Sequence, residues 1–291
     1  MMRISPISAI LAGCCLLFAT AGKAQAPSPQ PVEQLIKDVA YNELNDREHD
    51  SYWAYRIQQN IGQESFVKHQ VETEQGPIFR ILEEGGRPLT AEEERKEEAR
   101  LNSLLNNPSA LSKNREEHLQ DEARLQRLVK LMPEAFLFEP DGKVDGDLLT
   151  VNFKPNPNFK PPTYEARVFH GMAGAIIVDQ RLKRFVEMRG HLINRVDFGY
   201  GLLGSVEKGG QFEIHREQVS DTHWKTDLVD VHVAGHVILF KTVSKDHHEA
   251  RSQFQSVPTT ISLDEAKRLL DQAASRSEAN LHIAPHPGQN F

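Results

Sequence analysis

Two groups of histidines have the residue types that could bind a metal ion. His232 and His236 stand four positions apart, a spacing that brings two imidazoles together on a helix. They flank Val233-Ala234-Gly235 among β-branched residues, which favours a strand or turn, and four residues along a strand span about 13 Å. His247-His248-Glu249 could also supply ligands, but adjacent side chains on a strand point to opposite faces, and we expect a solvated loop there. The sequence therefore favours structural roles for both groups.

Two other segments resemble ligand-binding loops in their spacing. Residues 141–147 hold three aspartates and two glycines, faintly like a calcium loop, but the terminal glutamate of such a loop is missing. Residues 199–204 spell G-x-G-x-x-G, which binds phosphates where a strand leads directly into a helix. The residues that follow, Ser-Val-Glu-Lys-Gly-Gly, do not start a helix. We interpret the first segment as turns and the second as glycines that allow a sheet to bend.

No motif of a known catalytic class stands out. The chain contains no G-x-S-x-G nucleophile elbow, no P-loop and no H-E-x-x-H motif. Carboxylates are plentiful, but no pattern singles out an acid–base pair. We therefore expect no catalysis and no cofactor. A hydrolase of envelope polymers is the enzymatic alternative, and it would need two carboxylates about 5–9 Å apart in a cleft.

The N-terminal residues 1–26 have the pattern of an export signal. A short basic start precedes an almost entirely apolar or small stretch, residues 4–21. Ordinary cleavage after Ala21 or Ala24 is one interpretation, and an uncleaved anchor is another. In a third, Leu11-Ala12-Gly13-Cys14 is a lipobox, and acylated Cys14 would anchor the chain in the envelope. Residues 27–31 are expected to form a proline-containing linker.

Composition limits the classes of function further. Both cysteines, Cys14 and Cys15, lie in the signal, so ordinary cleavage would leave no disulfide, thiolate metal site or thiol nucleophile. The 291 residues are 39% hydrophobic and 26% charged, which excludes a wholly disordered chain and a multi-span membrane protein. The net charge of −7 repels phosphate backbones, so nucleic acid is not an expected partner.

The elements that would position a binding site begin with a helix and three strands. An apolar helical face predicts a helix from residue 32 to about residue 45; its members are Val32, Leu35, Ile36, Val39 and Ala40. Strand-like runs follow at 51–59, 64–73 and 77–83. Because parallel strands need long crossovers, these short connections predict an antiparallel meander.

A helical insertion is predicted at residues 90–132. Thr90 and Glu93 have the spacing of a capping box, which starts a strongly charged helix that ends near Asn106. Pro108 breaks this helix, and a second one is expected over 111–132. Acidic and basic residues are nearly balanced in this segment, which favours a solvated, self-paired helical hairpin over a nucleic-acid-binding arm.

Strands return after residue 134. The candidate strands are 135–138, 148–154, 173–179, 183–189, 198–206, 211–218, 225–233 and 236–243, with a short helix at 163–170. Residues 32–260 are expected to form a single α+β domain. Residues 261–291 are expected to form a short helix, over 263–270, and a flexible tail.

One hairpin carries a family resemblance. Ala173–Asp179, followed by Leu182, Phe185 and Met188, reads as a strand, an aspartate-led turn and a return strand. It resembles the G-x-(I/V)-x-(I/V)-D hairpin of the periplasmic lipoprotein-carrier (LolA/LolB-like) superfamily. Residues 211–214 and 221–225 look like the later hairpins of that family, and the order of elements is also similar. The resemblance extends over about residues 31–255.

The resemblance implies a curved antiparallel sheet, a half-barrel, covered by helices. A sheet too large to be filled by its own side chains leaves room for acyl chains. The ligand-lining candidates are strand residues with inward-capable spacing: Trp53, Tyr55, Ile57, Phe79, Ile81, Phe153, Ile176, Val178, Phe185 and Trp224. Ordinary core packing is the alternative role for the same side chains.

We therefore expect an exported, periplasmic cell-envelope protein that binds a lipid or another hydrophobic ligand without catalysis. Peripheral membrane association, or anchoring through Cys14, would be compatible with this role. The alternative is an envelope interaction or scaffold module with a solid core, in which the charged helical hairpin contacts a protein partner.

Overall fold

The computed structural model describes residues 31–45, 51–198, 204–237 and 246–283. The predicted export signal with Cys14, residues 199–203 of the glycine-rich segment and residues 238–243 of the last predicted strand lie outside the described residues. In the part of the chain that is described, no helix has both the length and the apolar character needed to cross a membrane.

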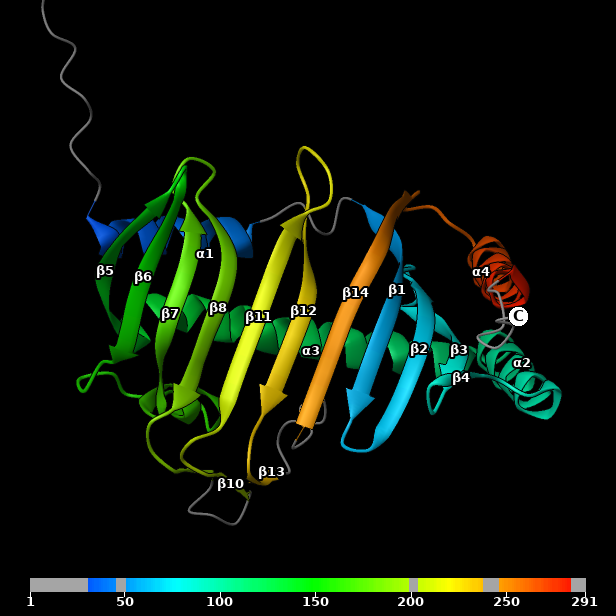
Figure 1. Cartoon of the computed structure of the whole chain (residues 1–291), viewed down its shortest axis with the longest axis horizontal. Coiled ribbons are helices and arrows are strands. Elements are labelled where there is room, and N and C mark those ends of the chain that lie inside the picture. Colours follow the sequence, from blue (N-terminus) through cyan, green and yellow to red (C-terminus); the bar gives the residue numbers. More distant parts are fainter. Residues whose placement is uncertain (1–30, 46–50, 199–203, 238–245, 284–291) are drawn as a thin grey trace, which may run out of the picture. The chain divides into compact units, whose positions relative to one another are not determined.

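An eleven-stranded antiparallel sheet is the largest element of the fold (Figure 1). Its spatial order is β4-β3-β2-β1-β14-β12-β11-β8-β7-β6-β5. Its strands are β1 (Tyr52–Ile61), β2 (Glu64–Val71), β3 (Ile78–Glu84), β4 (Arg87–Pro88), β5 (Phe136–Asp145), β6 (Leu148–Pro155), β7 (Met172–Asp179), β8 (Arg184–Leu192), β11 (Gln211–Gln218), β12 (Trp224–His232) and β14 (Asp246–Val257). A small second sheet contains β9 (Val196–Phe198), β10 (Gly204–Val206) and β13 (Gly235–Val237).

This architecture confirms the predicted α+β class with a large antiparallel sheet. The predicted meander is also confirmed, because β1 pairs with β2 and β2 pairs with β3, both antiparallel. The strand order has two ends, β4 and β5, so the sheet is open. The half-barrel expected from the sequence is not confirmed, because the sheet is neither closed nor strongly curled.

Strand β14 corrects one expectation. Residues 247–249 were expected in a solvated loop, but they belong to this strand, which lies between β1 and β12 and pairs with both. His247 and Glu249 are buried. The strand lacks the apolar alternation of a half-buried strand because polar side chains of neighbouring strands, rather than an apolar core, surround this part of it.

The helices cover the sheet and one of its edges. They are α1 (Val32–Leu44), α2 (Ala91–Leu105), α3 (Pro108–Ala135), the 3₁₀-helix η2 (Glu165–His170) and α4 (Leu263–Ile283). The helix predicted over residues 32–45 is present, with four of its predicted apolar residues buried: Leu35, Ile36, Val39 and Ala40. The capping box of Thr90 and Glu93 is present at the start of α2. Helix α4 extends well beyond the eight residues predicted, and within its predicted part Ala266 and Leu270 are buried in a core with residues of β1, β2 and β3.

Helix α2 covers the edge of the sheet at β3. The backbone N–H of Ile81 donates to the Glu97 carboxylate (2.8 Å), and Arg100 donates to the carbonyl of Phe79 (2.8 Å). Glu97 and Arg100 also bind each other (2.7 Å). The two side chains thus satisfy backbone groups that an edge strand would otherwise expose for pairing with another chain.

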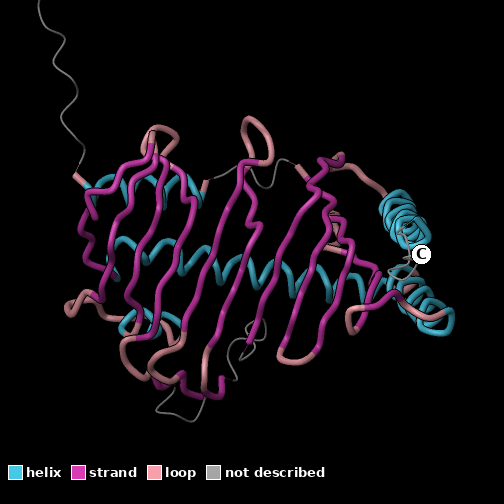
Figure 2. Tube along the Cα trace, in the orientation of Figure 1, coloured by secondary structure: helices cyan, strands magenta, loops and turns pink. Residues whose placement is uncertain are grey.

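Helix α3 crosses one face of the sheet, so the two helices of the insertion do not form the self-paired hairpin expected from the sequence (Figure 2). At its first turns, Asn114 donates to the carbonyls of Gln75 (2.9 Å) and Pro77 (3.1 Å) in the β2–β3 turn. At its far end, Leu128, Leu131 and Met132 pack on the core around β5 and β6. A helix of 28 residues is about 42 Å long, enough to span many strands. Pro108 at the start, capped by Asn107, lets the chain leave α2 in this new direction.

The two faces of the sheet carry different covers. Neighbouring residues of a strand point to opposite faces. Ala54 packs in the core that contains residues of α4, whereas Tyr55 and Ile57 belong to a separate buried cluster. Directly paired residues share a face of the sheet. Ile214 pairs with Val229, Val229 with Glu249, and Glu249 with Gln59. These residues therefore all lie on the face that α1 and α3 cover, which we call the α1–α3 face.

Candidate functional site

Helix α1 is fixed to the start of β8 by polar contacts at its C-terminal end. Asn42 donates from its side-chain amide to the carbonyl of Lys183 (3.0 Å), and Glu43 accepts from the backbone N–H of Phe185 (3.1 Å). Lys183 also forms an ion pair with Asp38. These contacts hold the apolar face of α1 over the sheet.

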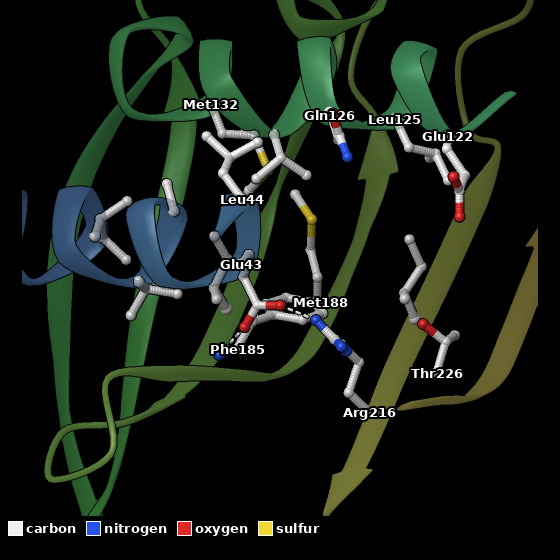
Figure 3. Close-up of a pocket in the computed structure, with 16 residues that line it drawn as sticks. Glu43, Leu44, Glu122, Leu125, Gln126, Met132, Phe185, Met188, Arg216 and Thr226 are labelled. Carbon is white, nitrogen blue, oxygen red and sulfur yellow. Dashed lines mark hydrogen bonds and ion pairs between the residues drawn. The ribbon is translucent and has the colours of Figure 1, made fainter. Parts of the chain in front are cut away.

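Helix α3 supplies the second cover. Val129 and Met132 lie on its sheet-facing side, and Leu125, Gln126 and Met132 extend from it toward the sheet (Figure 3). Leu125 is 63% exposed although it faces an apolar space. Leu125 therefore lies at the open side of the space between helix and sheet.

The sheet provides an apolar floor beneath the two helices. Ile176 of β7 lies opposite Met188 of β8, and Met188 lies opposite Ile214 of β11. These three side chains therefore form one row across neighbouring strands. Phe185 extends the floor toward α1, and Thr226 of β12 extends it in the other direction.

The helices and the floor line a cavity of about 290 Å³ that is open on one side. Its lining is mainly apolar and comes from parts of the chain far apart in sequence: α1 (Ile36, Val39, Ala40, Glu43, Leu44), α3 (Glu122, Leu125, Gln126, Val129, Met132) and the sheet (Ile176, Phe185, Met188, Ile214, Arg216, Thr226). Ligand pockets in proteins usually measure about 300–1,000 Å³, so this cavity lies just below that range.

A buried ion pair forms one wall of the cavity. The guanidinium of Arg216 in β11 contacts the carboxylate of Glu43 in α1, and both side chains are about 90% buried. Arg216 also donates to the carbonyl of Trp224 (2.6 Å). Burial lowers the pKa of Arg216 to about 10, which still leaves the guanidinium charged at neutral pH. The carboxylate of Glu43 compensates this charge in a site that water solvates poorly.

Two of the ten predicted lining residues line this cavity, and the other eight lie elsewhere. Ile176 and Phe185 line the cavity. Phe153 and Val178 are buried in the adjacent core, and Trp53, Tyr55 and Ile57 form a separate buried cluster. The remaining three, Phe79, Ile81 and Trp224, also lie outside the cavity wall.

Polar and aromatic side chains already occupy the face around Tyr55. Gln70 donates to the Tyr55 hydroxyl (2.5 Å), Gln59 donates to Glu249 (2.7 Å), and Arg251 binds Glu249 (2.7 Å). Burial alone would raise the pKa of Glu249, but the hydrogen bond with His247 and the charge of Arg251 lower it to about 2. Burial raises the pKa of the Tyr55 hydroxyl well above its usual value. This part of the face is a packed polar network.

Sequence reasoning missed Glu43 and Arg216. Each lies in an element that was predicted, but no local pattern connects a glutamate at the end of a helix with an arginine far along the chain. A charged residue on the inward face of β11 was the available signal, because Arg216 alternates with Phe212 and Ile214.

The metal-binding motifs considered in the sequence form no such site in the described residues, and most of the G-x-G-x-x-G segment lies outside them. No group of three or more potential ligands that could hold a metal ion occurs there. His232 ends β12 and His236 belongs to β13, as expected for a strand and turn. In the segment 141–147, Asp141 accepts from Asn152 (3.1 Å) and Asp147 binds Arg181 (2.9 Å).

Comparisons with protein-family models, with curated proteins and with solved structures found no match to this chain.

Proposed function

We propose that this protein binds an acyl chain or a similar hydrophobic ligand between α1, α3 and the sheet, in the cell envelope and without catalysis. The observation that carries the proposal is the apolar cavity of about 290 Å³ between two helices and the sheet. Each methylene buried there would contribute about 0.8 kcal/mol, so one chain can be held without precise polar recognition. The α1–α3 side of the sheet would be its concave side, as in the half-barrel that the resemblance to lipoprotein carriers implies.

The accessible side of the cavity supports entry of a ligand from the surface. Leu125 and Glu122 of α3 line the cavity and are partly exposed, whereas Glu43 and Arg216 are almost fully buried. The rim is therefore at α3 and the deep wall lies between α1 and β11. A chain would enter beside α3 and extend toward Met188 and Ile176.

The test is ligand binding with a variant that fills the cavity. Purified protein is extracted and analysed for co-purified lipid by mass spectrometry, and uptake of a pyrene-labelled fatty alcohol is followed by fluorescence. Thr226→Trp places a large side chain in the cavity from a strand position that suits tryptophan, and it should abolish uptake. Thr150→Trp, on the face of β6 opposite the buried Val151, is the matched control and should bind normally.

The outcome separates this proposal from the two other functions considered. A protein that contains no lipid and takes up no probe contradicts ligand binding, and leaves the scaffold role and the hydrolase as the candidates. Export is tested separately, by locating the protein in cell fractions and by comparing acylation of the unaltered chain with that of Cys14→Ala.

A further inference from the structure

The described residues that line the cavity include more negatively than positively charged side chains. Glu43, Glu122 and Arg216 are the charged side chains among the described residues that line it. Arg216 is engaged by Glu43 in the deep wall, and its second nitrogen donates to the carbonyl of Trp224. Glu122 is paired with His118 of the same helix (3.2 Å), and His118 does not line the cavity. The cavity wall thus holds two carboxylates and one guanidinium, and this guanidinium is already paired with one of the carboxylates.

The neighbours of this pair strengthen the arrangement. Arg184 lies behind Glu43, with its nitrogen 4.0 Å from the carboxylate, and donates to the carbonyl of Asn42 (3.4 Å). It does not line the cavity. Glu43 also accepts from the backbone N–H of Phe185, so its position is fixed by the helix, the sheet and an arginine together. A ligand anion could reach Arg216 only by displacing a carboxylate that is held on several sides.

We propose that the cavity selects ligands whose chain ends in an uncharged group, and discriminates against fatty-acid anions, because Glu43 neutralises its deep cation and Glu122 places a carboxylate at its rim. This inference rests on the proposed function and names its substrate class. An anionic amphiphile meets a carboxylate in either orientation: Glu43 if its head enters first, Glu122 if its head stays at the rim. Like charges brought together at the buried wall beside Glu43 are strongly unfavourable, and at the partly exposed rim beside Glu122 the repulsion is weaker.

The experiment compares two ligands of equal chain length, 1-dodecanol and dodecanoate, at pH 8, by displacement of the pyrene-labelled fatty alcohol. The unaltered protein should bind dodecanol at least about tenfold more tightly than dodecanoate. Glu43→Gln keeps an oxygen to accept from Phe185 but leaves Arg216 without its carboxylate. This variant should bind dodecanoate at least about tenfold more tightly than the unaltered protein does, and its ratio of dodecanol to dodecanoate affinity should fall accordingly.

Asp38→Asn is the matched control. Asp38 is also a carboxylate of α1 that pairs with a cation of the sheet region, Lys183, but it does not line the cavity. The control should keep the preference of the unaltered protein. Circular dichroism and thermal unfolding show that both variants are folded.

The outcomes separate this inference from the proposed function. Binding of neither ligand by the unaltered protein contradicts the proposed function itself. Tight binding of dodecanol with equal or tighter binding of dodecanoate contradicts the inference alone, as does a folded Glu43→Gln variant with an unchanged preference. Should Glu43→Gln fail to fold, the preference of the unaltered protein decides the question.

Discussion

Asn114 of α3 lies directly against Gly76 of the β2–β3 turn. Its amide nitrogen would be 2.8 Å from a Cβ at this position, and it donates to the carbonyls on both sides of the glycine. Gly76 also has a φ of +83°, which L-residues adopt at a cost. The start of the helix that crosses the sheet is thus anchored at a position where only glycine fits.

Gly76→Ala is therefore expected to destabilise the protein more than its backbone angle alone explains. Gly86 is the matched control, because its φ is +75° and no atom lies within 4 Å of a Cβ there. Gly86→Ala should cost about 1–2 kcal/mol of unfolding free energy. Gly76→Ala should cost at least about 1 kcal/mol more, because it also displaces Asn114. Chemical unfolding measures both, and equal losses would show that the contact with α3 contributes nothing.

Glu97→Ala is expected to expose the edge of the sheet. The substitution leaves the N–H of Ile81 without its acceptor and Arg100 without its carboxylate. We expect a loss of about 2–3 kcal/mol in the free energy of unfolding and a greater tendency to aggregate through β3. Glu92→Ala removes an exposed carboxylate of the same helix, paired with Lys96, and should cost less than about 0.5 kcal/mol. A Glu97 variant as stable and soluble as this control would contradict the role of α2 as an edge cover.

His69→Gln is expected to reduce the loss of stability in mild acid. Burial, and then the charges of Arg56 and Arg276, lower the pKa of His69 from 6.5 to about 4. The unfolded chain therefore binds a proton between pH 6.5 and 4 that the folded protein does not, so stability is complete above pH 6.5 and falls as the pH drops toward 4. After allowance for solvent screening, the variant should lose about 1–2 kcal/mol less over this window.

The loss of stability caused by Glu249 at lower pH serves as an internal control in the same titration. The lowered pKa of Glu249 makes stability fall between about pH 4.5 and 2, because its carboxylate is favoured in the folded state. This second loss should be the same in both proteins. Unfolding curves recorded from pH 8 to 2 check both windows, and parallel profiles above pH 4.5 would exclude His69 as the titrating group.

The sequence was most informative where local patterns determine structure. The helix at 32–44, the β1–β3 meander and the capping box of Thr90 and Glu93 each depend on residues within a few positions of one another. The path of α3 could not be predicted from the sequence. Its nearly balanced charges are compatible both with a helix that pairs with α2 in a hairpin and with a helix that crosses the sheet. Its direction depends on Asn114 and on apolar contacts with distant strands.

The candidate site was predicted only in part for the same reason. Ile176 and Phe185 belong to a local hairpin whose alternation is visible in the sequence. Glu43 and Arg216 become partners only when α1 is placed on the sheet. Strand β14 was missed because His247, Glu249 and Arg251 replace the apolar residues that mark a buried face, and their partners come from other strands.

The place of β14 governs when this fold can be completed. Strands β1–β4 arise early in the chain and β5–β12 later, yet β14, which is made after all of them, is the strand that bridges β1 and β12. Before β14 is added, β1 and β12 are edge strands of two sheet fragments, and each has unpaired backbone N–H and C=O groups. Because β14 joins these two fragments, the sheet can be completed only after nearly the whole chain has been synthesised. A chain cut short before residue 246 would lack the strand that pairs with both β1 and β12, and α3 would be left to connect the two parts of the sheet.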